Sequence, residues 1–219
     1  MIFGLGNTAR ARDVLALGFS VLVLLVGNTA VFGEEFLGHR HKAHSPIKRT
    51  MAHYQVPPVK LVDQDSNEIR FDRALDNDHP VVVEFFFTTC TTFCDLRAAR
   101  LTAVQQELAQ DNIEVSFFTI TVDPEFDVPD RLLAYSTRVK PIPNNWFLLT
   151  GPLSAIHQVE AAFDAINPSA DKMLHQPLTF IQARAGQEWL RLEGMMSSAG
   201  LADQVRQLMA KSNSLVAHR

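Results

Sequence analysis

The sequence feature that most constrains the fold is a short apolar run, VVVEFFF at residues 81–87, which is rich in β-branched and aromatic residues. A run of this length and composition is typical of a central strand that is covered on both faces. The next segment, residues 93–110, carries Leu101 and Leu108 on one side at helical spacing, with Arg97 elsewhere. The pattern predicts a buried strand that leads into an amphipathic helix.

The alternation of strand and helix continues along the chain. We expect buried strands at residues 115–121 and 146–150, each followed by a helix. A hairpin of two strands is expected at 178–181 and 188–192, and a last helix is indicated by the apolar positions of 201–209. The predicted fold class is an α/β sandwich in which helices flank a central mixed β-sheet.

The amino-terminal part of the chain contains an uncharged stretch of 20 residues between Asp13 and Glu34. This is about the length that an α-helix needs to cross the core of a bilayer. Arg10 and Arg12 give it the basic flank of a signal sequence or a signal anchor. We interpret residues 1–33 as an anchor, because the apolar run is longer than an ordinary signal-peptide core. Cleavage before Glu34 is the alternative.

The rest of the chain is divided into three parts. Residues 34–56 are polar and carry no sustained apolar period, so we interpret them as a linker, and the histidines of its sequence GHRHKAHS as part of a solvated stalk. Residues 57–211 form the predicted compact domain, and residues 212–219 a carboxy-terminal tail.

Composition excludes several classes of protein. The hydrophobic fraction of 47% and the charged fraction of 20% are those of a globular protein. A net charge of -4 offers no cationic surface, so no nucleic-acid partner is expected. The chain has 2 cysteines, too few for a disulfide scaffold or a four-thiolate zinc site. Their closeness in sequence is therefore the main chemical clue.

Cys90 and Cys94 lie at the predicted turn from strand to helix. The start of a helix presents unpaired N–H groups and the positive end of the helix dipole, and both favour a thiolate over a thiol. One helical turn can bring the two sulfurs to one side, where they could form a disulfide or hold one soft metal ion. A permanent structural disulfide is the alternative interpretation.

Copper(I) is a soft ion that is satisfied by two or three ligands, whereas zinc normally takes four donors, or three and a water. His175 is the best candidate for a third ligand, since it precedes the expected strand at 178–181. Strand ends at one edge of an α/β sheet gather around the same crevice. A structural role for this histidine is the alternative.

Three segments, FTTCTTFCDL, TITVDPEFDVPDRLLAYSTRV and LHQPLTFI, together resemble the Sco/SenC family of copper proteins over about residues 56–211. The resemblance implies a thioredoxin-like fold anchored by one amino-terminal membrane helix. It also implies that Cys90, Cys94 and His175 bind copper. The expected location is the cell inner membrane, spanned once, with the domain in the periplasm or an equivalent extracytoplasmic space.

The same resemblance implies a metallochaperone that helps to supply copper to the copper-accepting subunit of cytochrome c oxidase or to another copper protein. The alternative is a thiol-disulfide oxidoreductase that acts on the cysteines of a copper protein, with Cys90 and Cys94 as the redox-active pair. His175 distinguishes the two, because disulfide exchange needs no third ligand. A peroxiredoxin-like peroxidase is disfavoured, since Phe87 stands where that family has proline. We expect a metallochaperone rather than an enzyme.

Two residues depart from the family pattern, which usually has proline after the second cysteine and aspartate before the histidine. Here these positions are Asp95 and Leu174. The charge of Asp95 would oppose thiolate formation at Cys94. Leu174 removes a possible acceptor that could orient the imidazole of His175.

Several other polar or sulfur-bearing residues are interpreted as structural. Asp127 and Asp130 are predicted to supply the cap and a first-turn acid for a helix, and Asp123 to shape the turn that leaves a strand. His157 is expected at the surface or boundary of its helix. The two methionines at 195–196 are expected to pack in or beside the core.

Overall fold

The computed structural model describes residues 47–89, 94–139, 145–169 and 171–217. Its strands are β1 (Lys48–Ala52), β2 (Lys60–Asp63), β3 (Glu68–Arg70), β4 (Val81–Phe86), β5 (Ser116–Thr121), β6 (Trp146–Thr150), β7 (Leu178–Gln182) and β8 (Trp189–Glu193). They form one sheet in the order β1-β8-β7-β4-β5-β6-β2-β3. Strands β4, β5 and β6 are parallel, and every other neighbouring pair is antiparallel.

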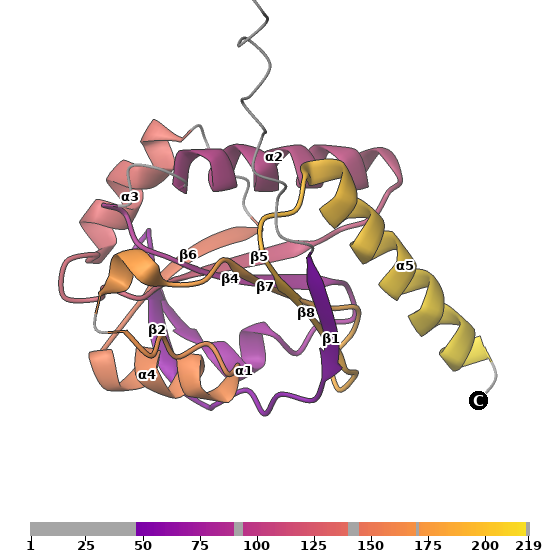
Figure 1. The fold of residues 1–219 in the computed structure, drawn as a ribbon, viewed down its shortest axis with the longest axis horizontal. Helices are drawn as coiled ribbons and strands as arrows, with labels where there is room; N and C mark the ends of the chain where they lie inside the picture. Colours follow the sequence, from indigo (N-terminus) through magenta and orange to yellow (C-terminus); the bar gives the residue numbers. More distant parts are fainter. Residues whose placement is uncertain (1–46, 90–93, 140–144, 170, 218–219) are drawn as a thin grey trace, which may run out of the picture. The chain divides into compact units, whose positions relative to one another are not determined.

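The helices are α1 (Phe71–Ala74), α2 (Cys94–Gln110), α3 (Pro129–Arg138), α4 (Leu153–Ala162) and α5 (Ser198–Ala217), with a short 3₁₀ turn, η1 (Lys172–Leu174). Helices α2, α3 and α5 cover one face of the sheet, and α1 and α4 cover the other (Figure 1). The sheet is mixed and has helices on both faces, so the predicted α/β class is confirmed.

Strand β4 lies in the middle of this sandwich, and all six of its residues are buried. Its side chains alternate between the two faces, as the pleat of a strand requires. Val82 and Phe86 pack in the core beneath α2 and α5, whereas Val81, Val83 and Phe85 pack in the core on the α1 and α4 side. The apolar run VVVEFFF is therefore a central strand, as predicted.

The sheet begins earlier than the predicted boundary at Pro57. Strand β1, which lies in the segment interpreted as a polar linker, pairs antiparallel with β8 from Lys48 opposite Glu193 to Ala52 opposite Trp189. Four of its five residues are exposed, so it lacks the apolar signal on which the boundary depended. Main-chain hydrogen bonds to β8 attach this edge strand to the sheet.

The domain also ends later than predicted. Helix α5 continues through Ala217, into the segment 212–219 that was expected to be a tail. Ser212 is buried there, and its hydroxyl accepts a hydrogen bond of 2.8 Å from the side-chain amide of Gln187. This contact fastens the last turns of α5 to the hairpin between β7 and β8.

The predicted membrane anchor, residues 1–33, lies outside the described residues. Within the described ranges no helix combines the length and the apolar character that crossing a bilayer requires.

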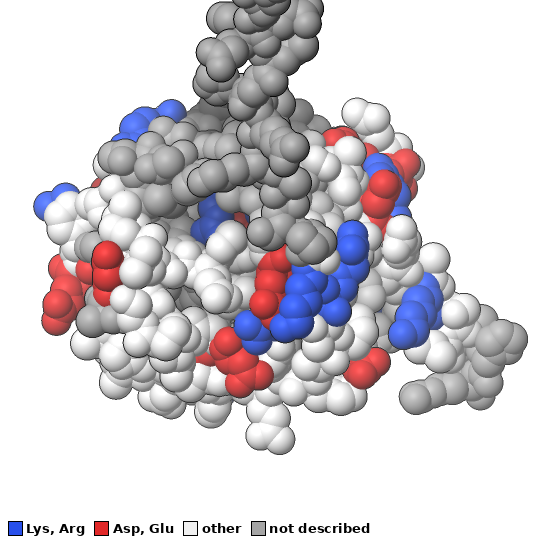
Figure 2. All heavy atoms as spheres, in the orientation of Figure 1, with Lys and Arg blue, Asp and Glu red and all other residues white. Residues whose placement is uncertain are grey.

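On the face seen in Figure 2, Lys and Arg side chains lie among Asp and Glu side chains. That mixture agrees with the slightly negative net charge of the chain.

Candidate functional site

The candidate site lies at the carboxyl end of β4. Strand β4 ends at Phe86 and α2 begins at Cys94, so the Cys-x-x-x-Cys turn is the connection between them. Cys90 lies outside the described residues, and only the backbone of Cys94 is described. The predicted transition from strand to helix is confirmed at the level of the backbone.

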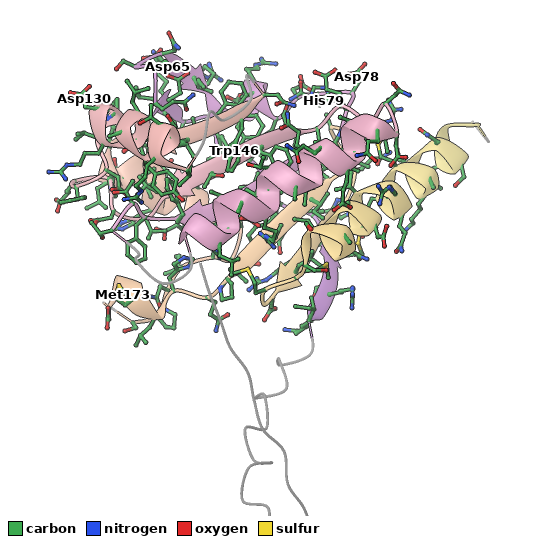
Figure 3. The ribbon with its side chains drawn as sticks, turned by 90° about the horizontal axis from the view of Figure 1, so that it is seen from above. Asp65, Asp78, His79, Asp130, Trp146 and Met173 are labelled. Atoms are coloured by element: carbon green, nitrogen blue, oxygen red, sulfur yellow. The ribbon has the colours of Figure 1, made fainter. Side chains whose placement is uncertain are left out.

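His175 is brought to the same place by the antiparallel pairing of β7 with β4, in which Glu84 is opposite Thr179. This pairing sets the beginning of β7 beside the end of β4. The imidazole of His175 contacts the ring of Phe87 edge to face, with 6.1 Å between ring centroids. Figures 1 and 3 both show η1, which carries the labelled Met173, on the side of the molecule where α2 begins. His175 therefore lies next to the residue that enters the cysteine turn.

The surroundings of His175 favour its neutral form. Burial, and next the positive charge of Arg97, lower the pKa of the imidazole from 6.5 to about 4. A backbone hydrogen bond at Gln176 and the charge of Glu84 act in the opposite direction but are weaker. At neutral pH the ring therefore keeps a nitrogen lone pair that can bind a metal ion.

Arg97 lies in the same helix as Cys94, three residues later, and is only 7% exposed. Its Nη1 donates a hydrogen bond of 2.6 Å to the carbonyl oxygen of Phe85. The sequence pattern sets Arg97 apart from the apolar side of the helix, and this prediction is wrong. The residue faces the sheet, where its guanidinium is a fixed cation close to His175.

A buried ion pair accompanies Arg97. Glu84, in the middle of β4, accepts hydrogen bonds from the Nη2 of Arg100 and the hydroxyl of Thr179. Burial would raise the pKa of Glu84, but the charges of Arg100 and Arg97 outweigh it, so the pKa is lowered and the carboxylate is ionised. Two guanidinium groups and one carboxylate leave this cluster with a net positive charge beside the start of α2.

We expect Arg97→Met to raise the pKa of His175 above about 4, because it removes the second largest cause of the depression and leaves burial in place. Arg97→Lys, which keeps the positive charge, is the matched control and should leave the pKa close to its original value. Titration of the imidazole protons by NMR in the copper-free protein measures both. An unchanged pKa in the methionine variant would contradict this assignment.

Asp127 forms hydrogen bonds with Thr88, which lies just before the cysteine turn, and with Thr121 at the end of β5. Its carboxylate, which is 0% exposed, accepts hydrogen bonds from the backbone N–H of Thr88 at 3.0 Å and the hydroxyl of Thr121 at 2.6 Å. The hydroxyl of Thr88 donates to its other oxygen. The prediction that Asp127 caps a helix was wrong, because α3 begins at Pro129 and its N-cap, Val128, makes no side-chain cap. Asp127 instead ties the residues before Cys90 to the end of β5.

The remaining predictions concern residues of the core and of the surface around the candidate site. The turn at Asp123 contains a main-chain hydrogen bond of 2.8 Å from the N–H of Asp127 to the carbonyl oxygen of Asp123. Met196 packs in the core, and His157 is exposed on α4. Leu174, which stands where the family usually has aspartate, is 64% exposed. It forms part of the surface beside His175.

The described side chains alone contain no cluster of three metal ligands. No group of three or more His, Cys, Asp or Glu side chains within the described ranges lies close enough together to hold a metal ion. The ligand set of Cys90, Cys94 and His175 includes residues beyond these side chains, so it stays a prediction.

Comparison with known proteins agrees with this arrangement. Residues 48–210 match the family model described as SCO1/SenC. The chain is 31% identical over 98 residues to the SCO1 protein homolog of Bacillus subtilis, which covers 45% of this chain and 50% of that protein. The chain thus spans about half the length of this curated relative.

Solved structures extend the similarity to most of the described domain. BsSco, a member of the Sco family of cytochrome c oxidase assembly proteins in which a disulfide switch was identified, aligns with a TM-score of 0.61 and 25% identity over 73% of this chain and 95% of its own. Yeast Sco1 with copper bound aligns with a TM-score of 0.60 and 18% identity over 72% of this chain and 90% of its own. These similarities confirm the predicted thioredoxin-like fold.

Proposed function

Because the chain belongs to the SCO1/SenC family, we propose that it carries copper as its cargo through Cys90, Cys94 and His175. It delivers the ion to the copper-accepting subunit of cytochrome c oxidase or to another copper protein. The observation that carries this proposal is the position of His175, a neutral imidazole beside Phe87, where β4 leads into the cysteine turn.

The donor set fits copper(I). Two thiolates and one imidazole are ligands that this soft ion accepts, and three donors satisfy it. The positive cluster of Glu84, Arg97 and Arg100 and the amino terminus of α2 both favour a thiolate at Cys94. These charges act in the direction opposite to the effect expected of Asp95.

The exposure of the two residues that precede His175 supports a transfer function. Met173 and Leu174, the two residues before His175, are 55% and 64% exposed. A partner protein can therefore approach the histidine side of the site directly. Copper then moves by ligand exchange, in which each donor of the partner replaces one donor of this chain, without a change in the oxidation state of the ion.

Titration of the reduced protein with Cu(I) against a competing chelator tests the proposal. We expect one copper ion per chain, and His175→Ala should weaken binding by roughly tenfold or more, which corresponds to about 1.4 kcal/mol. His79→Gln is the matched control, because His79 lies at the other end of β4, far from Met173 (Figure 3). Equal affinity of the wild type and the alanine variant would remove His175 from the site.

A second candidate function uses the same cysteines. BsSco contains a disulfide switch, which favours thiol-disulfide chemistry as the alternative. In that reaction one cysteine thiolate attacks a substrate disulfide and forms a mixed disulfide, while one substrate sulfur leaves as a thiolate. The other cysteine then displaces the second substrate sulfur. The products are a reduced substrate dithiol and an oxidised Cys90–Cys94 pair.

We further propose that residues 1–33 anchor the domain in the inner membrane, with residues 47–217 on its extracytoplasmic side. The support is the uncharged stretch between Asp13 and Glu34. The native protein is expected to stay in the membrane fraction after alkaline carbonate washing and to keep its amino terminus. Mature protein that begins near Glu34, measured by amino-terminal sequencing, would show cleavage instead.

A further inference from the structure

His175 also lines a pocket of about 380 Å³ on the α4 side of the sheet. The pocket lies between α4, the segment that follows it and the residues just before β7. Its floor is apolar and includes Phe85, Val122 and Leu178. Two residues of α4, His157 and Glu160, contribute a second imidazole and a carboxylate to its wall.

Glu160 is a buried acid that the fold does not use. It is only 8% exposed, and among the described residues no hydrogen-bond donor or ion-pair partner contacts its carboxylate. Burial raises its pKa, although the nearby charge of His157 acts in the opposite direction. The oxygens of Glu160 are not among the buried side-chain atoms that lack a partner, so they reach the open space of the pocket, where a carboxylate can receive a cation.

His157 supplies a second donor at the right spacing. It precedes Glu160 by three residues on α4, and side chains at this spacing lie on one face of a helix. His157 is exposed, so its ring can turn toward the pocket. The side chain of Asn167, which also lines the pocket, forms hydrogen bonds within its own loop. Its amide donates to the carbonyl oxygen of Asp171, and its oxygen accepts the N–H of Ser169.

We propose that Glu160 and His157 form a second cation site, for Cu²⁺ and similar divalent ions that accept nitrogen and oxygen donors. One imidazole and one carboxylate suit such ions and do not suit Cu⁺, which prefers sulfur. Two protein donors leave coordination positions for water, so the ion is held in an open site from which it exchanges. The proposal does not depend on copper binding at Cys90 and Cys94, because the donors are different.

The test uses the full-length chain in a background where Cys90 and Cys94 are serine and the three histidines of GHRHKAHS are glutamine. Calorimetry and electron paramagnetic resonance measure the binding of Cu²⁺ alone. One equivalent is expected, with the spectral signature of an imidazole nitrogen. Glu160→Gln and His157→Gln should each weaken binding by roughly tenfold or more.

Two matched controls are available. Glu114→Gln removes an exposed carboxylate before β5, and His79→Gln removes an imidazole before β4, so both should leave the Cu²⁺ affinity unchanged. Glu160→Gln should also raise the melting temperature of the metal-free protein at neutral pH, because burial raises the pKa of Glu160 and so disfavours its ionised form in the folded state. Cu²⁺ should stabilise the background protein but not this variant.

Three results would overturn the proposal. The first is an absence of Cu²⁺ binding in the background protein. The second is an unchanged affinity after Glu160→Gln, which would mean that the carboxylate is not a ligand. The third is binding that is lost with His175→Gln but kept with His157→Gln. None of these results bears on the proposed function, because the Cu(I) affinity of the protein with intact cysteines is measured in a separate titration.

Discussion

Replacing either Cys90 or Cys94 with serine is expected to weaken Cu(I) binding by at least about a hundredfold, or roughly 2.7 kcal/mol. The reason is that copper loses one of its two thiolates and keeps only one sulfur donor. The same substitutions abolish the intramolecular disulfide, since the chain has 2 cysteines in total. Competition titration and a count of free thiols after oxidation measure the two properties separately.

Thr91→Ser serves as the control for these variants, because it changes the same turn without removing a sulfur. It should retain both the copper affinity and the disulfide. A serine variant that binds Cu(I) as tightly as the wild type would exclude that cysteine as a ligand. The metal would then have to be held by donors outside the predicted set.

Glu84→Leu is expected to lower the free energy of unfolding by about 3–5 kcal/mol, the usual cost of removing one member of a buried ion pair. Glu84 is 2% exposed, and its loss leaves the guanidinium groups of Arg97 and Arg100 in the core without a carboxylate. Urea unfolding can be followed by tryptophan fluorescence, because Trp146 and Trp189 are both buried.

A triple variant distinguishes lost charge pairing from lost volume. When Glu84 becomes leucine and both Arg97 and Arg100 become methionine, no unpaired charge remains, and most of the stability should return. Glu84→Gln should fall between these limits, because its amide can still bond to Arg100 and to Thr179. A Glu84→Leu variant as stable as the wild type would show that the ion pair contributes nothing to folding.

The arrangement of the main elements could be predicted from the sequence because burial leaves a clear pattern. Strands β4 and β5 are buried at every residue and read as apolar runs. Strands β1, β2 and β3 were not predicted, since they are short and β1 is largely exposed. Main-chain pairing at a sheet edge selects no particular side chains, and so it leaves little trace in the sequence.

The buried charges show where pattern-based reasoning failed. Arg97 lies four residues before Leu101, so helical spacing already put it on the buried side of α2. A charged residue usually faces solvent, however, so residue type favours the opposite side. Glu84, an acid inside an apolar run, also indicates a buried charge in the sequence. Only the three-dimensional structure shows that Glu84 of β4 lies close to the arginines of α2.

The candidate site was predicted in part. His175 was proposed from its place before a strand and from a family resemblance, and the structure puts it beside Phe87 at the entry to the cysteine turn. The role of Asp127 in fixing Thr88 was missed, because an aspartate near a helix start reads equally well as a cap.

The most direct test of the copper site is X-ray absorption spectroscopy of the Cu(I)-loaded protein, compared with its His175→Ala variant. The proposed site predicts two sulfur neighbours and one nitrogen neighbour in the wild type, and loss of the nitrogen alone in the variant. Identical two-sulfur coordination in both proteins would contradict a ligand role for His175. It would also favour thiol-disulfide exchange at Cys90 and Cys94 over copper delivery.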